Sequence, residues 1–326
     1  MQQFNVLNLP SVALREVWRC LNPFELFEIS QCSKRCLETI ALAGTRKFKF
    51  ELDINQFIVS INNSWNFIVK DHRNIQEHTV EGNRKFGSHS FAVSIEQPTK
   101  IRFFSGNLES DFLAVFLHLS GLFKCPTHSV FACFPRDIYM SAIKYVCSQQ
   151  KTISNLDIMI GSDKDVDFIL NNLEVTESLR IAVDKLPVNY VLPCQIVCKS
   201  FRTFFSFFIT LDDILSMKES VDIQIHSSSL TNQDIEVLFQ HWISGNLPKL
   251  EYLHIDGEKF TKNMKIGDLK TLWGPSRRVI VRKIICGENR AVYAAVPLQR
   301  NDGIVAMFHF EPAQDDSPAF ISLLLP

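Results

Sequence analysis

The chain has 326 residues, of which 46% are hydrophobic, enough for one large domain with a small one or for two mid-sized domains. Its 34 Lys and Arg residues balance 35 Asp and Glu residues, so the net charge is −1 and the general basic footprint of a nucleic-acid or anionic-membrane binder is absent. The sequence shows no signal peptide and no apolar run of the roughly 18 residues that a spanning helix needs.

The nine cysteines are scattered, with no C-x-x-C pair. Two pairs are four residues apart, Cys32 with Cys36 and Cys194 with Cys198, and neither has a second ligand pair nearby. Helical spacing favours buried thiols for the first pair over a metal site. The cysteine usage predicts a reduced protein of the cytoplasm and/or nucleus.

Residues 5–44 predict three short helices. Pro10 begins the first helix, because the first helical position needs no backbone N–H. Asn22 is the expected N-cap of the second helix with Pro23 behind it, and Gly44 ends a third helix over 30–43. The first helix carries apolar residues at i, i+3, i+4 and i+7, namely Leu14, Val17, Trp18 and Leu21. A unit this small buries little surface alone and is expected to complete its core against another surface.

The ordered set of residues in this stretch resembles an F-box. It runs Leu9-Pro10, then Val17 and Leu21, then Asn22-Pro23-Phe24-Glu25-Leu26, then Ser30 and Ser33-Lys34-Arg35. The chain departs from many F-boxes at Cys36, where tryptophan is common. The resemblance implies docking on the Skp adaptor of a cullin-based ubiquitin ligase. The implied adaptor-binding residues are Leu9, Pro10, Leu14, Val17, Leu21, Pro23, Leu26, Ser30, Cys32, Ser33 and Leu37. The alternative is an ordinary N-terminal helical cap on a larger domain.

Strands are expected at 48–52, 57–61 and 65–69. The next stretch, 70–89, is the most polar of the chain and predicts an exposed loop and linker. Its histidines His72, His78 and His89 match no metal-binding spacing and are expected in solvent.

From about residue 90 a strand–helix repeat is predicted. Apolar, β-rich segments recur at 129–134, 156–160, 179–183, 201–208, 221–226 and 250–256. Their spacing of roughly 20 to 30 residues lies in the range of leucine-rich repeats, although the asparagine ladder of a true leucine-rich repeat is missing. Helical patterns at 137–149 and 165–173 lie between them. The alternative is a non-repetitive α/β or α+β domain.

The clearest helix is 232–244. Thr231 and Asp234 form a capping-box-like pair, and Gly245 ends the helix. Its apolar stripe is Ile235, Leu238, Phe239 and Trp242. The segment 230–256, with its Thr-Asn-Gln-Asp-Ile cap, the pair His241-Trp242 and the strand from Pro248 to Leu253, resembles the type-two F-box-associated domain of the expanded nematode F-box families. That resemblance implies capture of a substrate or partner.

The C-terminal segments 277–283, 291–296 and 304–310 alternate with turn signals and predict a small antiparallel sheet that closes the array. Residues 311–318 are expected as a loose tail, and the apolar end 320–326 is expected to dock back.

Signatures of catalysis are missing: there is no Walker-type loop, G-x-G-x-x-G, H-E-x-x-H or G-x-S-x-G. Asp163, Asp165 and Asp167 are expected as acids at a helix start rather than calcium ligands. The basic group Arg277, Arg278, Arg282 and Lys283 is expected as a solvated face. Phe204, Phe205, Phe207 and Phe208 are expected mainly as core residues, with a binding role as the alternative.

The predicted fold is α/β: a three-helix F-box at 1–47, connecting strands and a polar loop at 48–89, a degenerate leucine-rich-repeat-like array at 90–260 and a β cap with a tail at 261–326. The predicted function is a non-catalytic substrate receptor of an SCF-type ubiquitin ligase. Its partners would be the Skp adaptor, through it a cullin, and an unknown protein target, with no nucleic acid, membrane, cofactor or metal. The alternatives are a free interaction scaffold and an enzyme with an unrecognised site.

Overall fold

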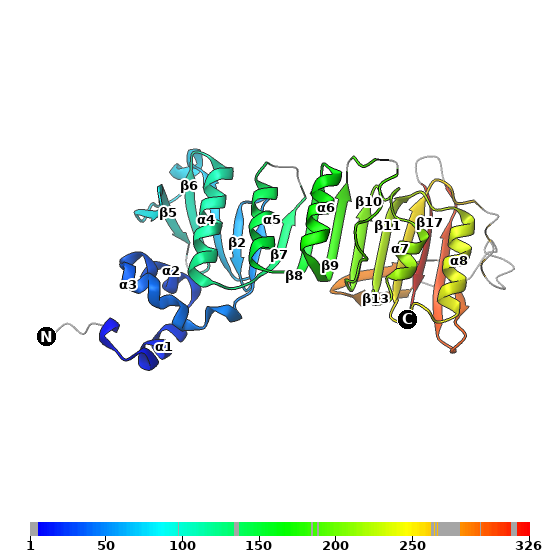
Figure 1. The fold of residues 1–326 in the computed structure, drawn as a ribbon, viewed down its shortest axis with the longest axis horizontal. Helices are drawn as coiled ribbons and strands as arrows, with labels where there is room; N and C mark the ends of the chain where they lie inside the picture. The colour runs from blue at the N-terminus through cyan, green and yellow to red at the C-terminus, as the bar shows by residue number, and fades with distance from the viewer. Residues whose placement is uncertain are drawn as a thin grey trace. The chain divides into compact units, whose positions relative to one another are not determined.

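The computed structural model describes residues 6–96, 98–133, 137–183, 185–187, 189–261, 264, 266, 281–293, 295–313 and 318–326. The chain divides into two compact units, Met1–Gln150 and Lys151–Pro326. The division falls inside the stretch 90–260 that the sequence predicts as one array. Each unit contains a sheet with helices on one face (Figure 1).

The first unit opens with short helices. They are η1 (Val6–Asn8), α1 (Ser11–Arg19), α2 (Pro23–Cys32), α3 (Lys34–Thr39), η2 (Ile40–Ala43) and η3 (Thr45–Lys47). Pro10 is the N-cap of α1, one residue before the first helical position that the sequence predicts for it. The Asn22 side chain accepts hydrogen bonds from the N–H groups of Phe24 and Glu25, and Glu25 accepts one from the Asn22 N–H, so the predicted cap is a full capping box. Gly44 ends η2 in the left-handed conformation at φ 73°, as the sequence predicts.

The single third helix predicted over 30–43 is wrong. Ser33 is extended, with φ −165° and ψ 159°, and its hydroxyl caps a new helix by accepting from the Cys36 N–H. A serine favours the N-cap because its oxygen satisfies an orphan N–H, and here that preference interrupts the apolar period. Cys32 and Cys36 therefore lie on different helices, and Cys32 is exposed while Cys36 is buried.

The sheet of the first unit has the order β7-β1-β2-β3-β6-β5-β4. Its strands are β1 (Phe50–Asp53), β2 (Ile58–Ile61), β3 (Trp65–Asp71), β4 (Asn83–Phe86), β5 (His89–Glu96), β6 (Lys100–Ser105) and β7 (Thr127–Ala132). Pairing is parallel for β1 with β7 and for β3 with β6, and antiparallel elsewhere. The helices α4 (Leu108–Phe123) and α5 (Asp137–Gln149) cover one face.

The polar stretch 70–89 is not only a loop. It contains η4 (His72–Glu77) and the strand β4, which pairs antiparallel with β5. Phe86 at the end of β4 is buried and packs on Phe91 and Phe103. One buried aromatic ring therefore anchors a segment whose composition alone predicts exposure.

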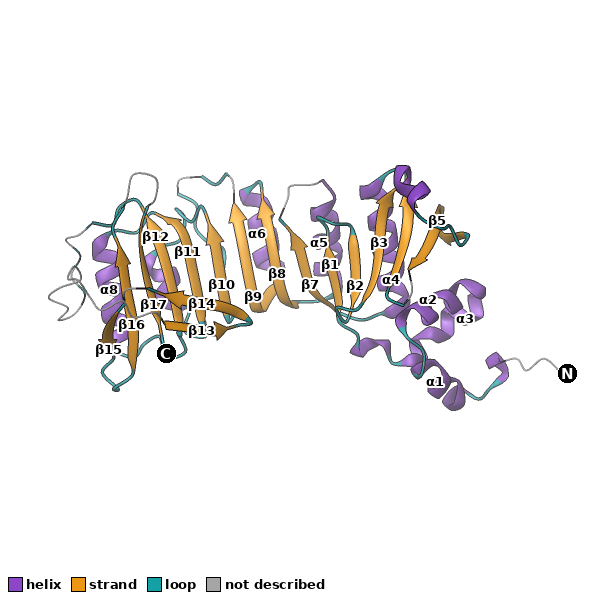
Figure 2. Ribbon diagram, turned by 180° about the vertical axis from the view of Figure 1, so that it is seen from behind, coloured by secondary structure: helices purple, strands orange, loops and turns teal. Residues whose placement is uncertain are grey.

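The second unit is built on five parallel strands. They are β8 (Thr152–Ile160), β9 (Glu174–Val183), β10 (Ser200–Phe204), β11 (Asp222–Ser228) and β12 (Tyr252–Gly257). The starts of consecutive strands are 22 to 30 residues apart. The helices are α6 (Asp163–Asn172), α7 (Leu211–Ser216) and α8 (Asn232–Ile243). Figure 2 shows the opposite face of this sheet, which these helices leave uncovered; it is called the strand face below.

The predicted helix at 232–244 is confirmed as α8. Thr231 accepts from the Asp234 N–H and Asp234 accepts from the Thr231 N–H. All four residues of the predicted apolar stripe are buried. At α6, Asp163 and Asp165 stand in the first turn behind the cap Ser162, where they complement the helix dipole as expected. Asp167 lies beyond the first turn and accepts a hydrogen bond from the Tyr190 hydroxyl at 2.7 Å.

The C-terminal residues close the second sheet. The strand β17 (Ala319–Leu324) lies antiparallel between β12 and β16 (Val305–Glu311), and β15 (Val296–Gln299) follows on the outside. The expected docking of the apolar end is thus confirmed. A separate hairpin, β13 (Val281–Ile285) with β14 (Glu288–Val292), packs on Tyr252 and Leu324 through Ile285 and Val292. Of the predicted basic group, Arg277 and Arg278 lie outside the described residues.

Candidate functional site

The second helix, α2, is fixed to the rest of the first unit by aromatic packing. Phe27 is fully buried, with ring centroids 5.5 Å from Phe67, 5.8 Å from Phe86 and 6.0 Å from Phe103. Phe24 packs edge-on against Phe67 at 4.9 Å. The N-terminal helices therefore complete their core against the sheet that follows them, as the sequence predicts for so small a unit.

Polar contacts reinforce this packing. The Arg84 guanidinium donates from Nη2 to Glu28 Oε2 at 2.5 Å and from Nε to Oε1 at 3.1 Å. The Thr45 hydroxyl donates to the carbonyl oxygen of Phe123 at the end of α4. Because a bidentate Arg–carboxylate pair fixes orientation as well as distance, α2 is held in a defined rotation on β4.

The predicted adaptor-binding residues separate into two sets. Leu14, Pro23, Leu26 and Ser30 are buried, and Leu26 has no exposed area. The members with exposed or partly exposed side chains are Leu9, Pro10, Val17, Leu21, Cys32, Ser33 and Leu37. In this conformation a partner reaches the second set directly, whereas the first set supports the helices from within.

The first helix keeps part of its apolar stripe at the surface. Leu14 and Trp18 are buried, and α1 packs on η2 within the N-terminal helices. Val17 is 37% exposed and Val12, on the same helix, is 67% exposed. A stripe buried entirely against residues after 45 would indicate a closed structural cap, and Val17 does not meet that condition.

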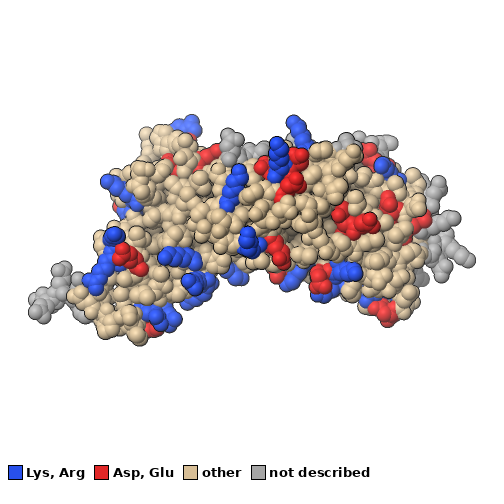
Figure 3. Space-filling model, in the orientation of Figure 1, with Lys and Arg blue, Asp and Glu red and all other residues tan. Residues whose placement is uncertain are grey.

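Basic side chains surround these helices. Arg15, Arg19, Lys34, Arg35, Arg46 and Lys47 are all exposed. Figure 3 shows Lys and Arg gathered around the N-terminal helices. Arg35 also donates to the Leu7 carbonyl oxygen at 2.7 Å, which ties η1 to α3. These six basic residues outnumber the exposed acidic residues Glu16, Glu25 and Glu38 of the same helices, so the surface around the exposed apolar residues is net basic and is called the basic frame below.

His118 of α4 couples the α2 contact to pH. Its ring stacks on Phe86 with centroids 4.4 Å apart, and its Nε2 lies 3.4 Å from Gln31 Nε2 on α2. Burial lowers the pKa of His118 from the ordinary 6.5. The folded chain therefore favours the neutral ring, and its stabilising effect is complete above pH 6.5 and is lost as the pH falls below it, because the unfolded chain takes up the proton first.

We therefore expect the free energy of unfolding to fall between pH 7 and pH 5, and His118→Gln to remove part of that slope. Urea unfolding at pH 7, 6 and 5 measures it, with His72→Gln, an exposed histidine, as the control. An unchanged slope in His118→Gln would contradict the assignment.

In the second unit, a polar row crosses the strand face. It consists of register partners on seven neighbouring strands: Asp157, Arg180, Arg202, Gln224, His254, Ser322 and His309. The residue after each of the first five is an apolar residue or threonine that is buried under the helices, such as Ile158 and Ile181. Strand side chains alternate between faces, so the row points away from the core.

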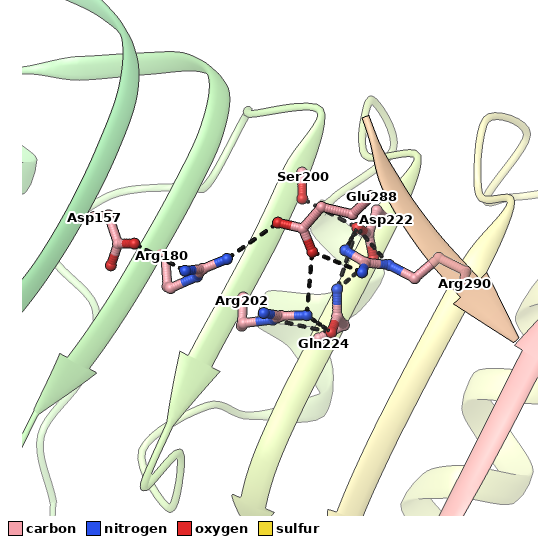
Figure 4. A network of polar contacts seen from close by, with 8 residues as sticks. All are labelled: Asp157, Arg180, Ser200, Arg202, Asp222, Gln224, Glu288 and Arg290. Atoms are coloured by element: carbon pink, nitrogen blue, oxygen red, sulfur yellow. Dashed lines mark hydrogen bonds and ion pairs between the residues drawn. The ribbon is translucent and has the colours of Figure 1, made fainter. Parts of the chain in front are cut away.

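Glu288 of the β13–β14 hairpin reaches into this row (Figure 4). Its carboxylate lies 3.1 Å from Arg180 Nη2, 3.5 Å from Arg202 Nη2 and 2.7 Å from Arg290 Nη1. Burial alone would raise the pKa of Glu288, but the hydrogen bond and charge of Arg290, with the charges of Arg202 and Arg180, lower it. The carboxylate is thus held ionised between three guanidinium groups.

Arg290 also makes a deeply buried ion pair. Its Nη2 lies 2.5 Å from Asp222 Oδ2, and the two side chains are 8% and 0% exposed. Asp222 further accepts from Ser200 Oγ at 3.2 Å and from Gln224 Nε2 at 2.9 Å. Burial lowers the pKa of Arg290, but the hydrogen bond and charge of Asp222 outweigh it and raise the pKa overall.

A cavity of about 460 Å³ opens in the second unit. Its lining combines the end of α6, the start of β9 and residues 194–198, including Leu170, Leu173, Val175 and Ile196. Burial raises the pKa of the Cys194 thiol and raises that of Cys198 to about 12. Both thiols are therefore protonated and poor nucleophiles, so the cavity suits an apolar side chain better than covalent chemistry.

Exposed phenylalanines follow β10. The predicted strand 201–208 ends at Phe204, because Phe205 adopts a left-handed φ of 57°. Phe205 and Phe207 are 50% and 37% exposed, while Phe208 is buried. Phenylalanine is enriched at protein interfaces relative to the rest of the protein surface.

The sequence analysis does not predict the polar row, although a recurring triplet in the strands indicates it. Each repeated strand has the local form apolar, polar, apolar or threonine, as in Leu156-Asp157-Ile158 and Leu179-Arg180-Ile181. Aligning the strands on that triplet places the polar residues in one register. Glu288 and Arg290 have no such signal, since only the tertiary packing of the hairpin brings them to the row.

Comparison with known proteins gives two family matches in this chain. Residues 6–42 match the F-box domain family and residues 189–255 match the F-box associated family. The uncharacterized protein F59B2.9 of Caenorhabditis elegans is 24% identical over 344 residues, covering 96% of this chain and 76% of its own length. The uncharacterized protein F54H12.5 of the same organism is 23% identical over 291 residues, covering 85% and 82%. No solved structure matches.

These matches confirm the resemblance drawn from the sequence to a nematode F-box protein with an F-box-associated region. Proteins of this two-part organisation are typically non-catalytic adaptors. Among the described residues, no helix combines the length and apolar character needed to cross a bilayer.

Proposed function

From an F-box domain at residues 6–42 and an F-box-associated region at residues 189–255 of one chain, we propose that this protein is a non-catalytic substrate receptor of an SCF-type ubiquitin ligase. F-box domains in general bind the Skp adaptor, and through it the chain would join a cullin. The observation that carries the proposal is the joint occurrence of the two regions in the order that such receptors use. The place of action would be the cytoplasm and/or the nucleus.

The adaptor contact in this proposal is made by the exposed residues of the predicted set. Val17 on α1 and Leu37 on α3 supply apolar area, and Pro10 lies exposed at the start of α1. The buried residues Leu14, Pro23 and Leu26 stabilise the packing of the N-terminal helices instead. The basic frame around them favours an adaptor surface that carries acidic residues, which would steer association and make it salt-sensitive.

Target capture in this proposal belongs to the second unit. Its parallel strands recur with the spacing of leucine-rich repeats, and we propose that the strand face acts as the recognition surface of a degenerate array of that kind. Gln224 and Ser322 of the polar row are buried, but Arg180 keeps 35% of its side chain exposed and supplies a charged group. Phe205 and the 460 Å³ cavity supply apolar contacts. The mechanism is proximity: a bound target is held at high effective concentration beside the ubiquitin carrier.

The test is retention of purified Skp adaptor by the full chain. The double variant Val17→Asp with Leu37→Asp is expected to weaken adaptor binding more than about tenfold, because each change puts a charge into an apolar contact worth on the order of 1–2 kcal/mol. Val237→Asp, at an exposed position of α8 in the second unit, is the matched control and should bind normally.

Thermal unfolding of each variant separates lost binding from lost folding. If the double variant remains folded and retains the adaptor fully, the assigned contact is wrong. If the unmodified chain does not retain the adaptor, the free interaction scaffold becomes the better account.

A further inference from the structure

Three side chains on β11 and β12 converge on one point of the strand face. They are His226, His254 and Asp256, and one ligand atom of each lies within 4.8 Å of the other two. We propose that they form a binding site for a divalent transition-metal ion of the zinc class. Two imidazoles and one carboxylate are a ligand set that zinc accepts, with a fourth position left for water or a partner's side chain.

The distances are close to those of a metal site. Asp256 Oδ2 lies 2.6 Å from His226 Nδ1 and 3.5 Å from His254 Nε2. In a tetrahedral zinc site with bonds of about 2.1 Å, ligand atoms lie about 3.4 Å apart. The second distance already fits, and the first needs to open by less than about 1 Å, which a side-chain rotation provides.

Each of the three ligands is oriented by a contact behind it. The His226 ring stacks on Phe204 with centroids 5.0 Å apart and planes 9° apart. His254 Nδ1 lies 2.9 Å from Ser322 Oγ, so its Nε2 faces Asp256. Metal-binding histidines usually engage their other ring nitrogen in this way, because that contact fixes the ring and its tautomer.

The carboxylate is held by the backbone. The Ser227 N–H donates to Asp256 Oδ1 at 2.6 Å, which leaves Oδ2 for both histidines. Ser227 adopts a left-handed φ of 58° there, a conformation that costs free energy for a residue other than glycine. Next to it, a Cβ on Gly257 would lie 2.7 Å from the Ser228 carbonyl oxygen, so glycine permits the close approach of β11 and β12.

A proton serves this arrangement less well than a metal ion. The 3.5 Å between His254 Nε2 and Asp256 Oδ2 exceeds the usual N–H···O range of about 2.7–3.2 Å. Both imidazole rings face Asp256 Oδ2, but only His226 lies within normal hydrogen-bonding distance of it. The side chains are 27%, 19% and 14% exposed in the order His226, His254, Asp256, so an ion would be partly desolvated yet reachable.

The proposed metal site lies on the strand face, the surface that the proposed function assigns to target recognition. His254 belongs to the polar row, and His226 and Asp256 stand at the carboxyl ends of parallel strands, where open α/β sheets commonly bind ligands. An ion there would join β11 to β12 and, through Ser322, to β17. The sequence predicts no metal because His226 lies 28 residues before His254 and 30 residues before Asp256, and the three residues form no local motif.

The experiment titrates the full chain with Zn²⁺ after its free thiols have been alkylated, because exposed Cys20, Cys32 and Cys286 would compete for zinc. Calorimetry is expected to give one bound ion per chain. Asp256→Asn and His254→Gln should each weaken binding more than about tenfold. Ser322→Ala, which removes the orienting contact to His254 together with a hydrogen bond to Tyr252, should weaken it by about tenfold. His72→Gln, a histidine of the other unit, should bind as the unmodified chain does.

Substitution by Co²⁺ gives a second readout on the unmutated chain that does not depend on the variants folding. We expect the visible bands of cobalt with nitrogen and oxygen ligands and no thiolate-to-cobalt charge transfer. Absence of binding by the alkylated chain, equal binding by folded Asp256→Asn, or a thiolate spectrum would each overturn the site. Adaptor retention should be the same for Asp256→Asn, so this outcome is independent of the proposed ligase role.

Discussion

Arg290→Ala is expected to destabilise the second unit by about 3–5 kcal/mol, because it leaves the fully buried Asp222 carboxylate without its cation. Ser200 and Gln224 still donate to Asp222, but neither carries a charge. The same change removes one of three guanidinium groups around Glu288. We therefore expect the β13–β14 hairpin to detach from the strand face before the parallel sheet unfolds.

Amide hydrogen exchange resolves these steps, since it reads β14 and β11 separately. Arg282→Ala, an exposed arginine in the same hairpin, is the matched control and should change stability by less than about 0.5 kcal/mol. Combining Arg290→Ala with Asp222→Asn should recover part of the loss, because no uncompensated charge then remains. A loss below about 1 kcal/mol in Arg290→Ala would mean that the pair is not buried as described.

Helix caps and apolar stripes, which depend only on residues close together in the chain, are predictable from the sequence. The cap of α8 depends on Thr231 and Asp234, three residues apart, and its stripe repeats with the helical period. The same holds for the cap at Asn22 and the left-handed Gly44. Such features need no knowledge of the rest of the fold, because their interacting groups lie within one or two turns.

Pairing between distant segments was not predictable in the same way. β4 forms because β5 is beside it and because Phe86 finds a buried place, neither of which the polar composition of 70–89 reveals. The apolar period of 30–43 runs through Ser33 and predicts one helix, whereas the Ser33 hydroxyl caps a new helix there. At both places a specific contact decides the local structure, against the composition or periodicity of the whole segment.

The candidate sites also combine features that the local sequence predicts with features that depend on distant segments. The apolar stripe of the N-terminal helices identifies which residues can pack, but it does not say which neighbour covers them. Leu26 and Val17 are both apolar residues of the predicted set, yet Leu26 is fully buried and Val17 is 37% exposed. The polar row and the set His226, His254 and Asp256 depend on strand register, which emerges only from the assembled sheet.

Phe27→Ala is expected to cost about 3–5 kcal/mol, since it empties a fully buried ring site between α2 and the sheet of the first unit. Phe67, Phe86 and Phe103 lose a common contact, and α2 keeps mainly Phe24 and the Arg84–Glu28 pair. Urea unfolding measures the loss. Adaptor binding should weaken as a consequence, in proportion to the fraction of chains whose N-terminal helices have detached.

Leu37→Ala separates this effect from direct binding. Leu37 is 39% exposed, so its truncation should leave the free energy of unfolding within about 1 kcal/mol while weakening adaptor binding. We expect Phe27→Ala to have the larger effect on the free energy of unfolding and Leu37→Ala to affect adaptor binding alone. That result requires α2 to face the sheet and α3 to face the partner. If Phe27→Ala leaves stability unchanged, the N-terminal helices fold independently of β3, β4 and β6, and the buried members of the predicted set regain a direct role in docking.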